Sequence, residues 1–306
     1  MKFKKNIALS KYTTFQIGGP TDYFIEVKNI DEVLEAVKWA KENKQNILPL
    51  GGGSNIVISD QGFRGLVIKL GLDRLEIRGE TATAGAGVVV SYLINQTLDR
   101  DLVGLEFMAG IPGTVGGAIR GNAGTYGQSM ADVLTEVRFL DEKYELRSMK
   151  PSEALFQYRH SIFKEKKYLI LEADLEFKKG DIDAARKLVD ERLKYRQDTQ
   201  PHQPSAGCIF KNLNLTDVDV TKLQAKGIDT TQFEKFQKIP AGYLIDHLGL
   251  KGKTIGGAQI SEKHANYIVN TGQATADDVI TLISFIKQQI RDEYGVQLQE
   301  EVQLII

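Results

Sequence analysis

The alternation of hydrophobic and polar positions in the first half of the chain predicts strands and helices that follow one another. Short apolar runs of strand length occupy residues 23–27, 46–50, 56–58 and 66–70. Between the first two runs, hydrophobic residues recur with the helical period at Val33, Leu34, Val37 and Ala40. Asn29 can cap this predicted helix, with Glu32 at its third position. A further short helix is expected around residues 92–94.

The second half predicts strands over residues 137–140 and 168–171, and then a helix over residues 183–196. Two prolines in residues 200–204 break that helix and predict a linker. A last helix is capped by Thr275, and its first turn carries Asp277 and Asp278, which favour the helix dipole. Its buried face is predicted to consist of Val279, Leu282, Ile283, Ile286 and Ile290. A strand over residues 302–306 follows.

Glycine is concentrated in the first part of the chain, where 19 of the 29 glycines lie between Gly18 and Gly127. One cluster, residues 51–55, follows the predicted strand 46–50, and a second runs from Gly110 to Gly117. A strand that enters such a loop presents backbone N–H groups suited to a pyrophosphate. Neither cluster has the ending of a P-loop or the order of the Rossmann fingerprint. We therefore expect a nucleotide cofactor in another fold; the alternative is a strand-rich domain with many turns.

The composition narrows the function mainly by exclusion. With 306 residues, the chain is long enough for about two domains. Its formal net charge of −1 gives no electrostatic attraction to nucleic acid or to an anionic membrane. One cysteine excludes a disulfide framework, and the four histidines lack ligand spacing, so we expect no metal site. No stretch has the length of a membrane span and residues 1–6 do not begin a signal peptide, so we expect a cytoplasmic protein.

Three further stretches place reactive groups in apolar or small-residue surroundings. Arg159 lies among apolar residues in 158–163, and the single cysteine, Cys208, follows a small-residue turn in 204–212. Residues 298–302 place Glu300 and Glu301 at the edge of the predicted last strand. Each has a simpler explanation, as a surface arginine, a small buried hydrophobe or a solvated strand end. The pattern alone does not separate the two carboxylates.

Eight segments resemble, in order, the UDP-N-acetylenolpyruvoylglucosamine reductase (UDP-N-acetylmuramate dehydrogenase) family, flavoenzymes of bacterial peptidoglycan synthesis. They are residues 13–19, 50–55, 110–117, 122–127, 158–161, 207–212, 264–270 and 298–302. The glycine-rich half also resembles the wider vanillyl-alcohol-oxidase-type FAD-binding fold. The resemblance implies an α+β protein with two FAD-binding lobes, residues 1–75 and 76–200, and an α+β substrate-binding domain, residues 201–306.

The family resemblance implies non-covalent FAD, NADPH as the reductant and UDP-N-acetylglucosamine enolpyruvate as the substrate. The flavin gives a hydride to the enolpyruvyl methylene carbon and the adjacent carbon receives a proton, which yields UDP-N-acetylmuramate. The first glycine loop contains no histidine, so a covalent flavin link is not expected there. No tyrosine-bearing loop follows the arginine motif, as in the shorter subtype of the family. A monomer is expected.

The resemblance also implies roles for individual residues. The guanidinium group of Arg159 can form paired hydrogen bonds with a carboxylate and can stabilise an enolate-like intermediate. Glu301 matches the catalytic glutamate, and a carboxyl group kept protonated by burial can donate a hydrogen bond. Cys208 stands where the family commonly has a serine proton donor. A thiol is the stronger acid, so the role is preserved, although the thiol is open to oxidation.

The remaining implied site residues fall into two groups. The residues expected at the cofactor are Gly51, Gly52, Gly53, Ser54, Asn55, Gly113, Thr114, Gly117 and Ala123. The residues expected at the substrate are Tyr158, Lys211, Asn212, Gln259 and His264.

Two alternative functions remain open from the residues. Another flavin enzyme of the same fold, such as an oxidase or dehydrogenase of a hydroxy acid, would keep the glycine loops but is expected to lack the set of Arg159, Cys208 and Glu301. A non-catalytic nucleotide-sugar-binding protein is favoured only by the cysteine in the position of the serine.

Overall fold

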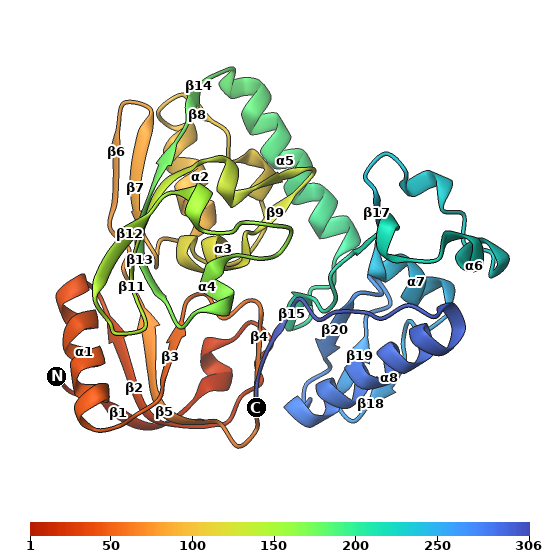
Figure 1. Ribbon diagram of the computed structural model, residues 1–306, viewed down its shortest axis with the longest axis horizontal. Coiled ribbons are helices and arrows are strands. Elements are labelled where there is room, and N and C mark those ends of the chain that lie inside the picture. The colour runs from red at the N-terminus through yellow and green to blue at the C-terminus, as the bar shows by residue number, and fades with distance from the viewer. The chain divides into compact units, whose positions relative to one another are not determined.

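The computed structural model describes residues 1–306, which form two compact units, and each unit is assembled from separate stretches of the chain (Figure 1). Unit 1 comprises Met1–Ile7, Thr21–Gly53 and Arg64–Asp198, and unit 2 comprises Ala8–Pro20, Ser54–Phe63 and Thr199–Ile306. The segment of residues 51–55 therefore crosses from one unit to the other. No helix combines the length and the apolar character needed to cross a membrane.

The first sheet of unit 1 has four strands in the order β1-β2-β5-β3. They are β1 (Lys4–Ala8), β2 (Pro20–Val27), β5 (Phe63–Leu70) and β3 (Ile47–Leu50). Strands β3 and β5 are parallel, and their register sets Leu50 opposite Lys69. Helix α1 (Ile30–Glu42) connects β2 to β3.

Helix α1 begins where the sequence predicts. The Asn29 side chain accepts a hydrogen bond of 2.9 Å from the Glu32 N–H, which confirms the cap. The buried face differs from the prediction at one position, because Leu34 is 40% exposed and Ala36 is buried instead. Leu34 and Ala36 both fit the helical period, but the face of α1 that packs inward is the one that contains Ala36.

The second sheet of unit 1 has five antiparallel strands in the order β12-β11-β13-β7-β6. They are β6 (Leu75–Arg78), β7 (Thr81–Gly85), β11 (Leu134–Leu140), β12 (Leu146–Met149) and β13 (Leu169–Glu176). The helices around it are α2 (Val90–Leu98), α3 (Val115–Gly121), α4 (Ile162–Glu165) and α5 (Ile182–Thr199). Two small ladders pair β8 (Leu102–Val103) with β14 (Lys178–Lys179) and β9 (Gly124–Thr125) with β10 (Gln128–Ser129). The strands and helices predicted in this region are confirmed.

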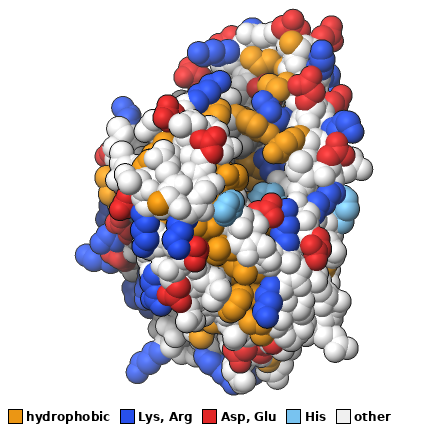
Figure 2. Space-filling model, turned by 90° about the vertical axis from the view of Figure 1, so that its right-hand side faces the viewer, with side chains coloured by type: hydrophobic (Ala, Val, Ile, Leu, Met, Phe, Trp, Pro, Cys, Tyr) orange, Lys and Arg blue, Asp and Glu red, His pale blue; other side chains and the backbone are white.

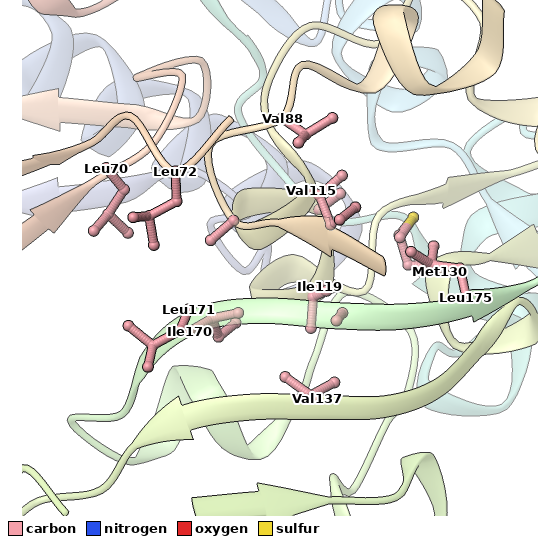
Figure 3. Close-up of a cluster of buried hydrophobic side chains, with 14 of the residues drawn as sticks. Leu70, Leu72, Val88, Val115, Ile119, Met130, Val137, Ile170, Leu171 and Leu175 are labelled. Carbon is pink, nitrogen blue, oxygen red and sulfur yellow. The ribbon is translucent and has the colours of Figure 1, made fainter. Parts of the chain in front are cut away.

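Helix α3 is fixed by the hydrophobic core between it and the second sheet. In Figure 3, Ile119 of α3 lies over β13, which carries Ile170 and Leu171, and Val137 extends from the neighbouring β11. Ile119, Leu171 and Val137 are fully buried. The loop that precedes α3 is the second glycine cluster, so this core sets where that loop lies.

Unit 2 contains a four-stranded antiparallel sheet in the order β15-β20-β19-β18. The strands are β15 (Ser205–Cys208), β20 (Tyr267–Asn270), β19 (Ala258–Ile260) and β18 (Thr254–Ile255). The helices are α6 (Val220–Ala225), α7 (Ala241–His247) and α8 (Ala276–Tyr294). Strand β16 (Leu213–Asn214) pairs with β17 (Lys238–Ile239), and β4 (Ile56–Ile58) pairs in parallel with β21 (Gln303–Ile305).

Helix α8 follows its sequence prediction closely. The Thr275 hydroxyl accepts a hydrogen bond from the Asp278 N–H, and the Asp278 carboxylate accepts one from the Thr275 N–H, each 3.0 Å long. All five hydrophobic residues predicted for its inner face are buried. Short 3₁₀ helices complete the two units at Leu9–Tyr12, Glu106–Met108, Met130–Asp132, Pro151–Glu153, Leu215–Asp217 and Thr231–Phe233.

One local prediction is wrong. The residues before Cys208 form strand β15 rather than a turn, and the register shift between Ser205 and Cys208 is accommodated by Gly207 at a φ of +77°. The last strand, β21 (Gln303–Ile305), confirms the strand predicted over residues 302–306, and Glu300, just before it, forms an isolated bridge with Phe210. The division into three parts at residues 75 and 200 stays a prediction.

The surface is mixed in charge on the face turned toward the viewer in Figure 2. Lysine and arginine side chains are interspersed there with aspartate and glutamate side chains, and hydrophobic side chains lie between them.

Candidate functional site

The two glycine clusters approach each other closely within unit 1. A Cβ atom added to Gly51 would lie 2.7 Å from Thr114 Oγ1, and one added to Gly52 would lie 2.8 Å from Gly113 Cα. The second of these contacts is with backbone, which cannot turn away as a side chain can. The glycines are therefore required because the two loops face each other without room for side chains.

The second cluster is anchored by backbone hydrogen bonds. The Gly113 carbonyl accepts a bond of 3.1 Å from the Val90 N–H, and the Val115 N–H donates to the Val88 carbonyl at 2.8 Å. The Gly116 N–H donates to the Ala86 carbonyl at 3.0 Å. These bonds attach the loop to the connection between β7 and α2, so the loop is fixed on the sheet.

Thr114 carries a polar group for which the chain supplies no partner. It occupies the N-cap position of α3, yet its hydroxyl makes no capping bond. The residue is only 5% exposed, and Thr114 Oγ1 has no hydrogen-bond partner. Because buried hydroxyls are nearly always satisfied, this atom indicates a polar ligand beside the loops. FAD, which carries an anionic diphosphate, fits that requirement and the close approach of the two backbones.

The predicted cofactor residues do not all lie together. Gly51, Gly52, Gly113 and Thr114 meet at the contact between the loops, and a Cβ at Gly117 would lie 3.6 Å from the Thr114 hydroxyl. Gly53 closes the first loop in unit 1, whereas Ser54 and Asn55 belong to unit 2. Ala123 follows the far end of α3, where its N–H donates to the Ala118 carbonyl at 2.8 Å.

Arg159 lies at the tip of a tight turn. The backbones of Gln157 and His160 exchange two hydrogen bonds of 3.1 Å, and Arg159 between them has a φ of +56°. This left-handed conformation costs about 1–2 kcal/mol for a residue other than glycine, as is common at functional sites. Arg159 Nη1 donates to the Gly124 carbonyl at 2.7 Å, and its Cζ lies 5.4 Å from the ring centre of Tyr158, which is partly exposed.

The Arg159 turn is joined to the loop that follows α3. Asn122 Nδ2 donates to the Gln157 carbonyl at 3.0 Å, and Asn122 Oδ1 accepts from the Ala131 N–H at 3.1 Å. Asn122 is buried. Two segments of the family motif, distant in the sequence, therefore form one connected structure in unit 1.

Cys208 and Glu301 are brought onto neighbouring segments of unit 2. The Ile209 N–H donates to the Asn266 carbonyl at 2.8 Å, and the Ile209 carbonyl accepts from the Glu301 N–H at 2.7 Å. The segment that carries Cys208 thus lies between β20 and residues 299–301. The Lys211 N–H extends this pairing by donating to the Gln299 carbonyl at 2.9 Å.

The structure separates the two adjacent glutamates, which the sequence pattern leaves unresolved. Glu300 Oε1 forms an ion pair of 2.7 Å with Lys287 Nζ of α8, and both side chains are largely buried. Glu300 therefore has a structural partner of opposite charge. The choice of Glu301 as the catalytic carboxyl group stays a prediction.

Asn55, expected at the cofactor, binds the backbone on both sides of Val302. Its Nδ2 donates to the Glu301 carbonyl at 3.3 Å, and its own carbonyl accepts from the Gln303 N–H at 3.1 Å. The Glu301 N–H is held by Ile209, so both backbone hydrogen-bonding groups of Glu301 are occupied. Asn55 thereby helps to fix the position of Glu301.

Of the predicted substrate residues in unit 2, two lie at the start of α7. Asn212 Oδ1 accepts from the Ala241 N–H at 3.3 Å, and a Cβ added to Gly242 would lie 3.3 Å from His264 Cε1. Burial lowers the pKa of His264, so the ring is neutral near pH 7. Gln259 Nε2 donates instead to the Gly252 carbonyl at 3.2 Å.

Sequence reasoning missed two residues that organise these sites. Asn266 is 3% exposed, and its carboxamide accepts from the Phe210 N–H at 3.0 Å and donates to the Phe210 carbonyl at 2.8 Å. Lys69 donates from Nζ to the Gly51 carbonyl. The available signals were an asparagine inside the family segment 264–270 and a lysine inside the apolar run 66–70.

Comparisons with known proteins agree with both halves of the chain. The family model for the C-terminal domain of UDP-N-acetylenolpyruvoylglucosamine reductase matches residues 200–305, and the model for an FAD binding domain matches residues 21–149. These matches confirm the predicted fold class, an α+β chain whose first half is an FAD-binding domain.

Similar proteins cover the chain almost completely. The UDP-N-acetylenolpyruvoylglucosamine reductase of Anoxybacillus flavithermus is 40% identical over 306 residues, which are 99% of this chain and 94% of the relative. The enzyme of the same name from Halalkalibacterium halodurans is 39% identical over 98% of this chain and 93% of its own. The crystal structure of the reductase from Thermus caldophilus superimposes with a TM-score of 0.80 at 30% identity, over 100% of both chains. The chain therefore belongs to the UDP-N-acetylenolpyruvoylglucosamine reductase family, a family of oxidoreductases.

Proposed function

We propose that this protein is an NADPH-dependent flavoenzyme that reduces UDP-N-acetylglucosamine enolpyruvate to UDP-N-acetylmuramate. The observation that carries the proposal is the full-length similarity, because it spans the FAD-binding half and the C-terminal domain alike. The product is a precursor of peptidoglycan, and we propose that the enzyme works in the cytoplasm as a monomer of the subtype without the tyrosine loop.

Residues of both glycine clusters would hold FAD without a covalent bond. The loop backbones of Gly51, Gly52, Gly53, Gly113 and Gly117 would surround the diphosphate, and the unpartnered hydroxyl of Thr114 would donate to it. Ser54, Asn55 and Ala123 would complete the site. When bound, FAD supplies the hydride chemistry that links NADPH to the enolpyruvyl methylene carbon.

The chain itself would supply the proton and stabilise the charge. Cys208 would transfer its thiol proton to the carbon next to the one that receives the hydride, so that one S–H bond breaks as one C–H bond forms. Solvent would then return a proton to the thiolate. Arg159 would pair with the substrate carboxylate as negative charge develops there, and Glu301 would donate a hydrogen bond in its protonated form.

Five residues would hold the UDP-sugar. We propose that Tyr158, Lys211, Asn212, Gln259 and His264 bind it. The contacts of Asn212 and His264 with the start of α7 support a shared role for these two at one end of the substrate.

An anaerobic titration followed by the visible spectrum tests the whole proposal. NADPH is expected to bleach a flavin band, and UDP-N-acetylglucosamine enolpyruvate is expected to restore it. A band that returns only with oxygen would favour a flavin oxidase of the same fold. A protein that binds no flavin even after FAD is added would contradict the assignment.

Variants at Cys208 test the proton donor. Cys208→Ser keeps a donor and is expected to retain turnover, whereas Cys208→Ala is expected to lose about 10²–10⁴-fold in kcat while still binding FAD. Iodoacetamide should inactivate the wild type and spare Cys208→Ser. A Cys208→Ala variant that turns over at the wild-type rate would exclude this thiol as the donor.

A further inference from the structure

Lys69 is a charged side chain inside the apolar run of residues 66–70. It belongs to β5, where Leu66, Val67 and Ile68 are fully buried. The parallel register of β5 and β3 sets Lys69 opposite Leu50, the residue that leads into the first glycine cluster. Lys69 Nζ donates to the Gly51 carbonyl. The ammonium group therefore lies at the base of the loop proposed to hold FAD.

The charge of Lys69 has no carboxylate partner. The acidic group that acts on it is Glu26 of β2, but Glu26 already forms an ion pair of 3.0 Å with Lys28. Lys28 carries the same charge as Lys69 and repels it. Burial lowers the pKa of Lys69, because the charged form loses hydration there. An unpaired, partly buried cation is costly, and a bound anion would remove that cost.

An ammonium group has three N–H donors, and the Gly51 carbonyl takes one of them. The remaining donors can reach oxygen atoms of a ligand that lies along the same loop. A diphosphate is the anionic part of FAD, and lysine binds phosphate as a point charge.

We propose that Lys69 is the counter-ion of the FAD diphosphate, and that it binds this group while holding the Gly51 carbonyl. The inference rests on the proposed FAD site and adds to it a residue outside the glycine motifs. Lys69 would therefore set the affinity for the cofactor, and it would take no part in hydride or proton transfer.

The test compares FAD binding by the wild type with that by three variants, using flavin fluorescence at low salt. Lys69→Met keeps the length of the side chain and removes the charge, and we expect its Kd for FAD to rise at least tenfold, or about 1.4 kcal/mol. Lys69→Arg keeps the charge and should stay within about threefold. Arg64→Met, on the same strand and 78% exposed, is the matched control and should bind FAD like the wild type.

Salt and a competitor distinguish a charge effect from a change in loop shape. The tenfold difference should shrink in 1 M NaCl, where the Debye length falls to about 3 Å. Inorganic pyrophosphate should compete with FAD on the wild type and lose that ability on Lys69→Met. A Lys69→Met variant that binds FAD within threefold of the wild type would overturn the proposal, as would a loss that is equal at both salt concentrations.

A measurement on the wild type covers the case in which Lys69→Met does not fold. Acetylation of lysines by acetic anhydride, followed by peptide mapping, should be slower at Lys69 when FAD or pyrophosphate is bound and unchanged at Lys28. Equal acetylation of Lys69 with and without FAD would refute the contact. A wild type that binds no FAD overturns both this inference and the proposed function, whereas lost turnover with intact FAD binding affects the proposed function alone.

Discussion

Replacement of Asn266 by leucine removes the two hydrogen bonds that hold the segment after Cys208. The Phe210 N–H and carbonyl are both buried and both bind the Asn266 carboxamide, at 3.0 Å and 2.8 Å. Leucine has a similar volume and can satisfy neither group. Each unsatisfied backbone group costs about 1–3 kcal/mol, so we expect a loss of about 2–6 kcal/mol in the free energy of unfolding. That is a large share of the ~5–15 kcal/mol of a typical domain.

Urea unfolding followed by far-UV circular dichroism measures this loss. The single tryptophan, Trp39, lies in unit 1, and its fluorescence reports separately on that unit. Asn214→Leu is the matched control, because the Asn214 side chain is exposed and bonds to the side chains of Asp217 and Lys238. It should change stability by less than about 0.5 kcal/mol.

The acidic variant Asn266→Asp sharpens the test. A carboxylate still accepts from the Phe210 N–H but cannot donate to the Phe210 carbonyl, and its charge is buried. A protonated carboxyl group regains the donor, so Asn266→Asp should recover part of the lost stability as the pH falls below its raised pKa. The reasoning is refuted if Asn266→Leu costs less than about 1 kcal/mol, or if Asn266→Asp shows no recovery relative to the wild type in acid.

Three further predictions concern single contacts. Gly52→Ala should lower the free energy of unfolding in urea by about 1–3 kcal/mol and weaken FAD binding, because its Cβ would lie 2.8 Å from Gly113 Cα. The control Gly121→Ala has open space around the new Cβ and should be neutral or slightly stabilising. Equal effects of the two variants would contradict the close approach of the loops. Thr275→Val should lower stability by about 1 kcal/mol by removing the α8 cap, and thermal unfolding that is unchanged would show that the cap is dispensable. Arg138 lowers the pKa of Asp174 through their hydrogen bonds. At a pH above the ordinary aspartate pKa of ~4, this pair therefore stabilises the fold. The stabilisation is lost as the pH falls through the lowered pKa of Asp174 in the folded protein. Arg138→Met should therefore cost about 2 kcal/mol at pH 7 and much less near pH 2, and a loss that does not depend on pH would contradict this account.

Local signals in the sequence were sufficient for most helices and strands. Asn29 and Thr275 mark helix starts because their side chains bond within one turn, and such bonds depend only on neighbouring residues. The position of Cys208 was harder to predict. Gly207 suggests a turn from its residue type, but pairing with β20, about 60 residues later, draws this segment into a sheet. The pairing with β20 outweighs the local preference of Gly207 for a turn, and no local sequence pattern identifies that partner strand.

The candidate site shows the same limit. The glycine loops were identified because close backbone approach demands glycine, a requirement visible in composition. The separation of Glu300 from Glu301 depends on Lys287 of α8, and the role of Asn55 depends on the Glu301 carbonyl. Asn55 and Glu301 are 246 positions apart. Contacts over such distances follow from the topology of the sheets, which hydrophobic periodicity does not encode.

The parallel pairing of β4 with β21 has a consequence for how the chain is made. On the ribosome, residues 56–58 emerge long before residues 303–305, with which they pair. Val57 and Ile58 are fully buried in the folded protein, so for most of translation this apolar strand has an open edge and no partner. Unit 2 can close only after nearly the whole chain has been synthesised. The nascent protein therefore carries an early, exposed, aggregation-prone strand, and we expect its folding yield in cells to depend on chaperones that shield this strand during synthesis.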